Sequence, residues 1–531
     1  MSKIGNYLQE HLNGELIENS EIRKYYSMDQ GPLQVVPSFV AFPADERDVR
    51  KINRFCFQLS QRGKYVPITA RGYGSSFNGS SLSSGLIMST TNHLNKILVV
   101  DNKSGLVVVE AGINYSDLNK QLQSRGLCLP FKSDQTNLSL GGIISSNYGS
   151  IEQYVKSLKI VLSNGEILVT ENLNDKELSK KMGQLNFEGE IYRAVDAILE
   201  ENKNLSELSK NISSSSAGYA LDKIKNKNGF DLTPLFIGAE GTLGVITEVT
   251  IKTEILKIED EKYLLASFEN YQDLSNGLNV LNSLSIKPDS IEFFDESVFK
   301  SLDFISPNLI NNWITKPYSK AYLLIGFMGV RKNVDKGLSK TMKHLKELSS
   351  NIFVVDENES EISLKHKLSN LKKVLLSHYD KGQRGIRVID SMAAPLECIN
   401  DLLNGLDILS KKLNIRLAIS GNIADGNISV ISICDVNEIG DRQSFFKLLH
   451  DSSDLVISLG GSISSEGGRG RTLTPYMNKE FNPQMMLIFK KIKNIFDPQY
   501  ILNPNVKFDT TEDQIKELLT NTYQPRYIEN Y

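Results

Sequence analysis

Residues 65–91 read YVPITARGYGSSFNGSSLSSGLIMSTT, and this stretch decides the fold assignment. Residues 65–70 favour a β-strand, because β-branched and aromatic side chains are common in strands. Residues 71–85 then change abruptly to glycine, serine and asparagine. A turn without bulky side chains lets a phosphate or an aromatic ligand approach the backbone, and its successive N–H groups can bind an anion.

Two further glycine clusters occur in the first half of the chain, each after a β-like run. SDQTNLSLGGIISSNYGS covers residues 133–150. LFIGAEGTLGVITEVTIKT, residues 235–253, predicts a strand, a glycine turn and a second strand. One such cluster alone is more often a tight β-turn than a binding site. Three clusters in one predicted domain instead favour a site for a phosphate or a nucleotide.

The familiar nucleotide-binding fingerprints do not account for these clusters. The sequence contains no GxxxxGK[ST] motif, so a P-loop is excluded. RGYGSSFNG begins with GxG but does not continue to GxGxxG, and no acidic residue follows at the offset that binds a ribose. A Rossmann NAD site is therefore not supported.

The composition of the 531 residues limits the classes of function. Lys+Arg total 60 and Asp+Glu total 63, a net charge of −3 that gives no overall attraction for nucleic acid. The four cysteines form no CxxC pair, which argues against an iron–sulfur cluster, a structural zinc or a disulfide framework. The N-terminal residues lack the apolar core of a leader, and no stretch reaches the ~20 apolar residues of a membrane span. We expect a soluble cytoplasmic protein, with peripheral membrane contact left open.

The rest of the first half predicts mixed helices and strands. Residues 1–30 have a polar, helical pattern. Strands are then expected at 37–42, 65–70, 86–91, 97–101 and 106–112, and helices at 43–63, 115–126 and 175–210. Residues 157–170 predict a β-hairpin, in which Asn164-Gly165 is the signal of a type I′ turn.

Beyond residue 255 the pattern changes to helices that alternate with apolar strands. Strands are expected at 263–268, 321–329, 385–390 and 428–436. Such alternation predicts an α+β class with strands packed against helices. We place a first domain at 1–255, a second at 256–460, and a C-terminal segment, 461–531, that returns to the first, because chain ends often lie together.

The motifs of the first half resemble the FAD-binding domain of the vanillyl-alcohol oxidase / p-cresol methylhydroxylase (PCMH) superfamily. The resemblance is carried by ITARGYGSSFNGSSLSSGLIMSTTNHLNKI, VVVEAGINYSDL, LCLPFKSDQTNLSLGGIISSNYGS and PLFIGAEGTLGVITEVTIK, which occur in the expected order. SGNIADGNISV and GGSISSEGGRGR are similar to segments of the D-lactate dehydrogenase / glycolate oxidase branch. The resemblance implies a two-subdomain PCMH-type FAD-binding domain and an α+β cap with an antiparallel sheet.

The resemblance also assigns the cofactor to particular residues. Those expected at the pyrophosphate are Arg71, Gly72, Tyr73, Gly74, Ser75, Ser76 and Asn78. Those expected along the flavin and ribityl chain are Pro130, Ser139, Leu140, Gly141, Gly142, Ser145 and Asn147. Those expected at the adenine half are Glu240, Gly241, Thr242, Gly244, Val245 and Ile246. Residues 71–79 contain neither His nor Cys, so FAD is expected to bind noncovalently.

The sequence departs from the family at its metal-site histidines. Relatives in this branch carry GHxGDGNxH and EHGxG, whereas the corresponding positions here are Asn422, Ser429 and Gly467. Neutral Asn, Ser and Gly do not replace imidazole ligands of a transition metal. We therefore expect no metal site and no histidine base for alcohol oxidation.

The resemblance implies oxidation of a 2-hydroxy acid such as D-lactate or glycolate, or of a related alcohol, by hydride transfer to flavin N5. Arg469 and Arg471 are candidate ligands of the substrate carboxylate, and the alternative is that they form a solvated basic turn. The candidate proton acceptors are Glu466, Tyr476 and His366. Asn422 is a candidate because it stands at a former histidine position. Asp390 and Asn427 are expected to be structural. The electrons would pass to a separate acceptor, namely a quinone, a cytochrome, an electron-transfer protein or oxygen.

Two other functions remain open at this point. One is an oxidase for a sugar alcohol or a lactone, which needs no acid chelation by a metal. The other is a flavin-binding subunit of a redox complex without catalytic activity of its own.

Overall fold

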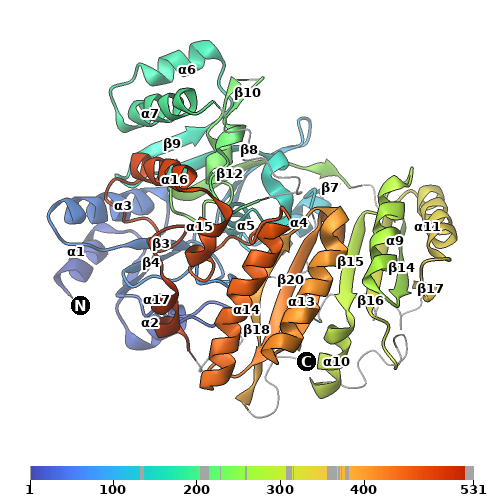
Figure 1. The fold of residues 1–531 in the computed structure, drawn as a ribbon. Helices are drawn as coiled ribbons and strands as arrows, with labels where there is room; N and C mark the ends of the chain where they lie inside the picture. Colours follow the sequence, from blue (N-terminus) through green and yellow to red (C-terminus); the bar gives the residue numbers. More distant parts are fainter. Residues whose placement is uncertain are drawn as a thin grey trace. The chain divides into compact units, whose positions relative to one another are not determined.

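The computed structural model describes residues 2–131, 137–203, 215–227, 229–256, 260–305, 314, 316–355, 368, 371, 374–376 and 382–520. Its contacts divide the chain into two compact units, whose elements are labelled in Figure 1. Unit 1 comprises residues 1–210, 216–256 and 466–523. Unit 2 is built from residues 257–465. The chain therefore leaves unit 1 after Leu256 and re-enters it at Glu466.

The first sheet of unit 1 has four strands in the order β1 (Glu15–Ile17), β2 (Phe39–Phe42), β4 (Leu86–Ser89) and β3 (Ile68–Arg71). Strands β2 and β3 lie parallel to β4, whereas β1 is antiparallel to β2. Ile68 also forms a parallel bridge with Leu502, so the C-terminal segment extends this sheet. The glycine turn at 71–79 thus leaves the carboxyl end of a buried parallel strand.

Helices pack against this sheet as their apolar periodicity predicts. Helix α3 (Glu46–Gln61) starts after the N-cap Asp45 and ends before Gly63, and it buries Val49, Ile52 and Cys56. The helical expectation for residues 1–30 is only partly right. Helices α1 (Lys3–His11) and α2 (Ser20–Tyr26) form there, but β1 separates them and pairs with β2.

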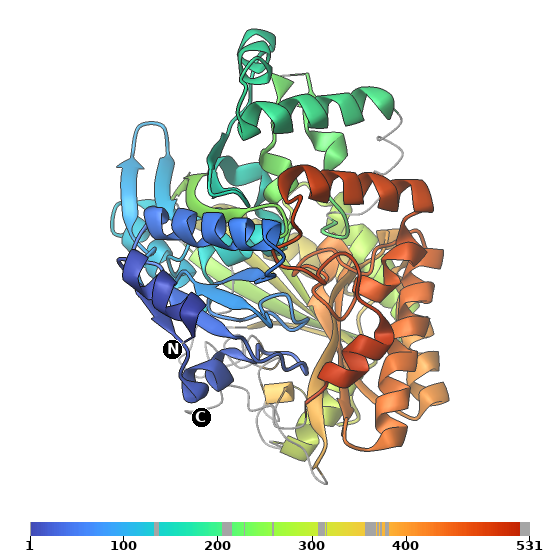
Figure 2. The same ribbon diagram turned by 90° about the vertical axis from the view of Figure 1, so that its left-hand side faces the viewer.

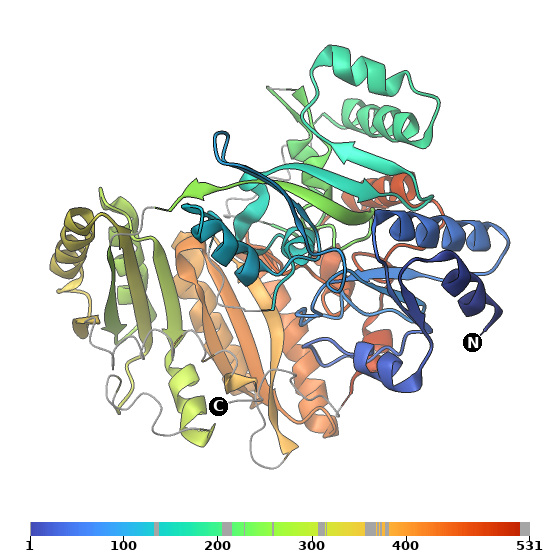
Figure 3. The ribbon, with the colours of Figure 1, turned by 180° about the vertical axis from the view of Figure 1, so that it is seen from behind.

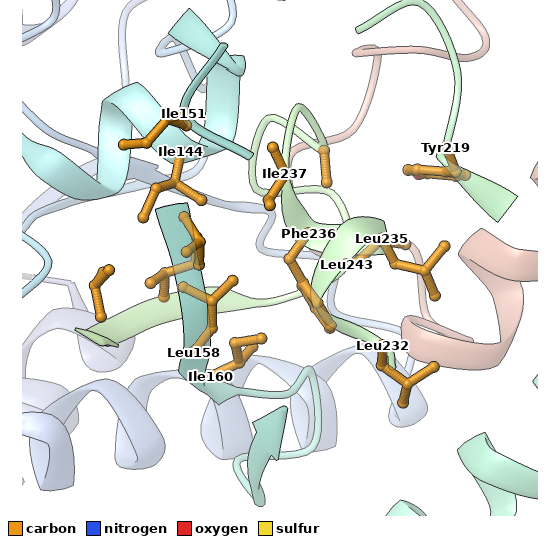
Figure 4. Close-up of a cluster of buried hydrophobic side chains, with 14 of the residues drawn as sticks. Ile144, Ile151, Leu158, Ile160, Tyr219, Leu232, Leu235, Phe236, Ile237 and Leu243 are labelled. Atoms are coloured by element: carbon orange, nitrogen blue, oxygen red, sulfur yellow. The ribbon is translucent and has the colours of Figure 1, made fainter. Parts of the chain in front are cut away.

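The second sheet of unit 1 has five antiparallel strands in the order β5 (Ile97–Asp101), β6 (Leu106–Glu110), β12 (Val245–Lys252), β8 (Val155–Val161) and β9 (Ile167–Thr170). Side chains of this sheet belong to one of the hydrophobic core clusters of unit 1. Figure 4 shows Leu158 and Ile160 of β8 packed near Phe236, Leu243 and Ile144.

The other elements of unit 1 are α4 (Tyr115–Gln123), α5 (Leu140–Ser146), α6 (Asp175–Met182), α7 (Phe187–Glu201), α8 (Thr233–Phe236), α15 (Met477–Glu480), α16 (Pro483–Phe496), α17 (Glu512–Leu518) and the pairs β7 (Leu127–Cys128) with β13 (Glu254–Ile255) and β10 (Lys225–Asn226) with β11 (Gly229–Phe230).

Two local expectations for this sheet are wrong. The β8–β9 turn is not type I′, because only Gly165 of the Asn164-Gly165 pair has a positive φ, +82°, and its N–H donates to the carbonyl of Leu162 at 2.9 Å. The turn is longer than two residues, so one left-handed glycine closes it. The first strand expected within 235–253 is instead the end of the short helix α8, whose Pro234 provides the preset φ of a first helical turn.

Unit 2 contains a seven-stranded sheet in the order β17 (Asn351–Val355), β14 (Asp260–Phe268), β16 (Ala321–Gly329), β15 (Ser290–Asp295), β19 (Arg416–Asn422), β20 (Asn427–Cys434) and β18 (Arg384–Ala393). Every pair of neighbours is antiparallel. Helices α9 (Tyr271–Ser283), α11 (Arg331–Leu345), α13 (Ile399–Leu413) and α14 (Ile439–Ser458) cover one face, and Figure 3 gives the view from behind. Helix α10 (Glu296–Ile305) follows β15. The α+β class with an antiparallel cap sheet is confirmed, although β15, β17 and β19 were not expected.

Candidate functional site

The first glycine turn is held by a buried arginine. Arg71 ends β3, and its guanidinium donates to the carbonyls of Met28 at 2.7 Å, Tyr26 at 3.2 Å and Ser81 at 3.4 Å. Gly74 has φ +69°, and a Cβ there would lie 2.2 Å from Arg71 Nη2. Only glycine fits at position 74, so Arg71 shapes the turn from inside.

Asp29, which no sequence motif indicates, lies beneath the same turn. Its carboxylate accepts the N–H groups of Gly31 at 2.8 Å and Gly79 at 2.9 Å. Burial raises the pKa of Asp29 to about 6, against the opposing effect of these N–H groups and of the Arg71 charge. The turn-like sequence at residues 28–32 was the available signal, but nothing in it indicated contact with Gly79, fifty positions later.

The second glycine cluster forms helix α5, and the first turn packs directly against it. A Cβ at Gly72 would lie 2.1 Å from Ser139 Oγ, so the Ser139 side chain packs where a larger residue at position 72 would place its own. Ser139 caps α5 by accepting the N–H of Gly142 at 3.2 Å. Gly141 packs on Ala111, where a Cβ would lie 2.9 Å from the alanine Cβ. Gly142 is exposed, and a Cβ there would meet only Ser139 Oγ, so its open side is free for a ligand.

The third glycine cluster lies against the C-terminal end of α5. The N–H of Gly238 donates to Ile144 at 2.9 Å, and the N–H of Glu240 donates to Ser145 at 2.8 Å. Gly241 has φ +71° and no atom within 4 Å of an added Cβ. Asn147 is buried, and its Oδ1 has no hydrogen-bond partner among the described residues. All three clusters therefore meet at α5, with open space at Gly142 and Gly241.

The other residues assigned to the cofactor divide by burial. Tyr73, Ser75 and Ser76 of the first turn are partly exposed, as is Pro130 next to the buried Phe131. Four others are buried in the core, so their side chains support the turns from behind: Leu140, Thr242, Val245 and Ile246. Gly244 packs on β8, where a Cβ would lie 2.4 Å from Ile160 Cγ2.

Glu240 and Asn78 tie these turns to the C-terminal glycine segment. The Glu240 carboxylate accepts the N–H of Gly470 at 2.7 Å and that of Arg469 at 3.1 Å, and it lies 3.7 Å from Lys507 Nζ. Burial raises the pKa of Glu240, with the Lys507 charge opposing. Asn78 Nδ2 donates to the carbonyls of Gly467 and Gly468 at 3.2 and 3.0 Å.

Two further residues belong to this network, and no local sequence motif indicates them. Asn503 donates to the carbonyls of Ser80 at 2.8 Å and Glu240 at 2.7 Å, and it accepts the Thr69 hydroxyl at 3.0 Å. Lys507 donates to the carbonyl of Ser216 at 2.9 Å, and burial lowers its pKa to about 8. Both follow the helix α16, and only the return of the chain to unit 1 brings them to the glycine turns.

The two candidate arginines are not a solvated turn. Arg469 is 0% exposed and forms an ion pair with Glu480, while its Nε and Nη1 atoms have no hydrogen-bond partner among the described residues. Arg471 is 4% exposed and donates to the carbonyls of Gly79 at 3.2 Å and Leu82 at 2.8 Å. Burial lowers the pKa of both groups, that of Arg471 to about 10.

The other catalytic candidates lie in different parts of the molecule. Tyr476 is buried in unit 1, and its hydroxyl donates to Glu512 at 3.2 Å. Burial and the Glu512 charge raise the pKa of Tyr476. Glu466 is partly exposed and accepts the Ser150 hydroxyl at 3.2 Å. His366 lies outside the described residues.

Asn422 belongs to unit 2, at the end of β19. Its amide donates to Asp425 at 2.6 Å, and burial raises the pKa of Asp425. Asn427 Oδ1 and Ser429 Oγ are buried on β20 without a hydrogen-bond partner among the described residues. Asp390 forms an ion pair with Arg387. Within the described part of the chain, no group of three or more His, Cys, Asp or Glu side chains is arranged to hold a metal ion.

Comparison with known families decides the identity of the cofactor domain. Residues 37–171 match the family described as FAD binding domain, and residues 257–506 match the C-terminal domain of FAD linked oxidases. The chain belongs to the FAD-linked oxidases. This FAD-linked oxidase also contains no helix, in the part of the chain that is described, long and apolar enough to cross a bilayer.

Relatives of this FAD-linked oxidase cover most of its length. The glycolate oxidase subunit GlcD of Bacillus subtilis is 24% identical over 92% of each chain. D-lactate dehydrogenase of Anaerostipes hadrus is 24% identical, over 83% of this chain and 84% of that protein. D-2-hydroxyglutarate dehydrogenase of Haemophilus influenzae is 25% identical over 96% of this chain, which spans 51% of that longer protein.

Solved structures share the fold of this FAD-linked oxidase. p-Cresol methylhydroxylase with substrate bound matches with a TM-score of 0.69 and 14% identity, over 95% of this chain and 96% of that one. The 4-ethylphenol oxidase of Gulosibacter chungangensis matches with a TM-score of 0.67 and 15% identity, over 97% and 99%. These matches confirm the PCMH-type architecture.

The residues present fit FAD. A dinucleotide needs close approach to the backbone at its phosphates, and Gly142 and Gly241 leave space where any other side chain would intrude. Ser75 and Ser76 of the first turn are partly exposed, and the N-terminal turn of α5 begins at the cap Ser139, so both glycine segments offer uncharged polar groups. The expected cofactor is therefore confirmed as FAD by the matched domain, and the enzyme class is an FAD-dependent oxidoreductase.

Proposed function

We propose that this enzyme oxidises the CH–OH group of a 2-hydroxy acid to the 2-oxo acid. Bound FAD supplies a two-electron acceptor at its flavin ring. Oxidation would remove the hydrogen and two electrons from the substrate carbon, which is the chemistry that FAD would supply, and a base of the protein would accept the hydroxyl proton. The meeting of three glycine turns at α5 carries the cofactor half of the proposal. The names of the relatives, which concern glycolate, D-lactate and D-2-hydroxyglutarate, support the substrate half.

We propose three roles around the cofactor. Tyr73, Ser75 and Ser76 would contact the pyrophosphate, with Arg71 and Asp29 holding the turn from behind. Ser139, Gly142 and Ser145 would lie along the ribityl chain, and Gly241 would approach the adenine half. Binding would be noncovalent, since residues 71–79 offer no His or Cys to attach the ring.

We propose Glu466 as the proton acceptor in unit 1. It is partly exposed, and the Ser150 hydroxyl orients its carboxylate. Arg469, Arg471 and Tyr476 would act as positioning residues, because each is buried and bonded within unit 1. Asn422 is the candidate substrate contact of unit 2, where Asp425 orients its amide.

A second candidate substrate is an alcohol or lactone without a carboxylate. It is favoured because the buried arginines already have partners within the protein. The Arg469 charge is compensated by Glu480, the Arg387 charge by Asp390, and Arg471 is committed to backbone carbonyls. A substrate carboxylate would have to compete with these partners or reach the buried Nε and Nη1 of Arg469. A quinone, a cytochrome, an electron-transfer protein or oxygen would take up the electrons in either case, at a proposed cytoplasmic location.

Replacement of Gly142 by arginine tests the cofactor site. The long charged side chain would occupy the open side of α5, so Gly142→Arg is expected to purify without its yellow flavin. Gly440→Arg is the control, because Gly440 is an exposed helical glycine like Gly142, but it lies on α14 of unit 2 and has no atom within 4 Å of an added Cβ. The ratio of flavin to protein absorbance is the measurement, and a full ratio in Gly142→Arg would show that the site is misplaced.

Anaerobic stopped-flow reduction of the bound flavin tests the substrate. D-2-hydroxy acids, polyols and lactones are compared at equal concentration. Bleaching by a hydroxy acid supports the main proposal, and bleaching only by a polyol or lactone supports the second candidate. Bleaching by none, with a partner that co-purifies, would indicate a flavin-binding subunit without catalysis. Colourless protein that stays colourless after incubation with FAD would refute all three.

A further inference from the structure

Strand β5 is an edge strand with an unusual exposure pattern. It is the terminal strand of the five-stranded sheet and pairs only with β6 among the described strands, so its outer N–H and C=O groups face away from the sheet. Figure 2 shows the β5–β6 hairpin at the left margin, in light blue. Leu98 is 44% exposed and Val99 is 53% exposed, although neighbours in a regular strand point to opposite faces. A groove of about 440 Å³ beside β5 is lined by Asn95–Val100, Gln121 and Arg125.

A β-bulge explains why two consecutive apolar residues are exposed. Ile97 pairs with Val109 and Val99 with Val108, so Leu98 is an extra residue in β5. Ile97 and Val100 lie on the face of the buried Val107 and Val109 and pack against the core. Leu98 and Val99 therefore share the opposite face. The bulge changes the alternation of side chains at the middle of the strand.

The sequence around this bulge is symmetric in character. Residues 95–102 read NKILVVDN. Read from the centre outward, each half contains two apolar residues, then a charged residue, then an asparagine. The charges are opposite, Lys96 and Asp101, and both side chains are exposed. Hydrogen bonds from Ser104 and Lys103 lower the pKa of Asp101, which keeps it ionised at neutral pH. The two halves are therefore complementary to one another when the strand is reversed.

Two identical strands that pair antiparallel are related by a two-fold axis perpendicular to the sheet. Such an axis keeps every side chain on its own face, so two residues can oppose each other only if they share a face. In a regular strand, Leu98 and Val99 fail this condition. The bulge satisfies it, because it places Leu98 with Val99 and Ile97 with Val100 on common faces. Lys96 accepts the N–H of Glu110 through its carbonyl, which places it on the face of Asp101. The register that matches the charges is thus also the one that matches the faces.

We propose that a second copy of this chain pairs with β5 through its own β5, antiparallel and centred between Leu98 and Val99. Lys96 of each copy then lies opposite Asp101 of the other, and Leu98 lies opposite Val99. The two five-stranded sheets continue as one ten-stranded sheet across the dyad. Pairing satisfies the outer backbone groups and covers the exposed Leu98 and Val99 side chains.

The size and charge of this surface set the expected behaviour. One strand pair with a few side chains is smaller than a standard interface, so the dimer is expected to be in exchange with monomer. Exposed ion pairs are screened by salt, so dissociation should increase with ionic strength. Both properties distinguish this dimer from a large, permanent, apolar interface.

Complementary charge variants of the full-length holoprotein test the register. Lys96→Glu opposes Glu to Asp101, and Asp101→Lys opposes Lys to Lys96, so each variant alone should raise the dimer dissociation constant roughly tenfold or more. When the two variants are mixed, every opposing pair is again of opposite sign. Sedimentation of the mixture should therefore recover a dimer that neither variant forms alone. A tag on one variant identifies the mixed species.

Lys103→Glu is the matched control for Lys96→Glu, because it makes the same charge change at another exposed position of the hairpin. In the proposed register, residue 103 lies opposite no charged residue. Leu98→Lys is an independent disruption that leaves the hydrogen bonds of Asp101 in place. Flavin content and melting temperature establish that each variant is folded. Wild-type protein that remains monomeric at high concentration would overturn the proposal. So would a dimer that the Lys96 and Leu98 variants leave intact, or two charge variants that fail to associate when mixed.

Discussion

At the scale of single residues, the glycine turns depend on charged groups that are buried beneath them. Asp29 binds the N–H of Gly79, Arg71 binds three carbonyls, and Glu240 binds the N–H groups of Arg469 and Gly470. Burial of a charge is costly unless it is hydrogen-bonded, and each of these groups is bonded to backbone. The turns are thereby held rigid without any bulky side chain in the space left for FAD.

The first prediction concerns the pH dependence caused by Asp29. Its pKa is raised from 3.8 to about 6 in the folded protein, so the folded state binds more protons than the unfolded state between these values. The stability that this group contributes is complete below pH 3.8 and is lost as the pH rises through 6. In Asp29→Asn this component is absent. The melting temperature of wild type relative to Asp29→Asn should therefore fall as the pH is raised from 4 to 7.

Asp222→Asn supplies the control for loss of one negative charge at an exposed position. Its difference from wild type should stay nearly constant over the same pH range. If the advantage of wild type over Asp29→Asn instead grew with pH, the Asp29 carboxylate would be stabilised in its ionised form, contrary to the expected direction.

At the scale of elements, short turns decide where the strands and helices lead. The β8–β9 hairpin contacts α3 through its turn, where Arg50 Nε donates to the carbonyl of Gly165 at 3.1 Å. A Cβ at Gly165 would lie 2.6 Å from the carbonyl oxygen of Arg50. The turn therefore joins the five-stranded sheet to the helix that covers the four-stranded one, and its glycine is required for both conformation and contact.

The second prediction compares two left-handed glycines. Gly63 has φ +78° with no atom within 4 Å of an added Cβ, whereas Gly165 has φ +82° and the close Arg50 carbonyl. Gly63→Ala should lower the free energy of unfolding by about 1 kcal/mol, the cost of the conformation alone. Gly165→Ala should cost about 1–3 kcal/mol more, because the helix backbone must move. Differential scanning calorimetry of both variants measures the order, and equal losses would contradict the packing argument.

At the scale of the whole molecule, all residues assigned to FAD belong to unit 1, although they come from three separate parts of the sequence. The C-terminal part supplies the groups that hold the turns, namely Gly467, Arg469, Arg471, Asn503 and Lys507. Ligand binding to the folded state alone adds to stability by mass action. FAD is therefore expected to be part of what stabilises unit 1.

The third prediction separates the cofactor from metal ions. Removal of FAD should lower the melting temperature, and added FAD should restore it in a concentration-dependent way. At a hundred times its dissociation constant, FAD should raise the free energy of unfolding by about 2.7 kcal/mol. Treatment with EDTA should change neither the melting temperature nor the rate of flavin reduction, because Asn422, Ser429 and Gly467 occupy the histidine positions. Loss of activity in EDTA, with recovery on addition of zinc or manganese, would contradict this expectation.

Local sequence signals predicted much of the fold. Helix α3 was expected from its cap, its apolar spacing and the glycine after it, and strands β2, β4, β5 and β6 from their β-branched runs. Strand β1 and helix α8 were missed because tertiary pairing with β2 and Pro234 outweighed the local pattern. The glycine clusters indicated the cofactor because close approach to backbone requires glycine wherever it occurs.

The sequence by itself determined the class of cofactor, the composition of the three turns and the absence of histidines at the former metal positions. Only the tertiary structure decided which distant segments the buried charges contact: Glu240 binds the N–H of Arg469, and Arg471 binds the carbonyl of Gly79. It also decided that Asp29, Asn503 and Lys507 hold the same turns. The physical reason is the separation along the sequence over which each effect acts. Backbone preferences are set by neighbours along the chain, whereas the partner of a buried charge is set by which distant segments the fold brings within a hydrogen bond's length.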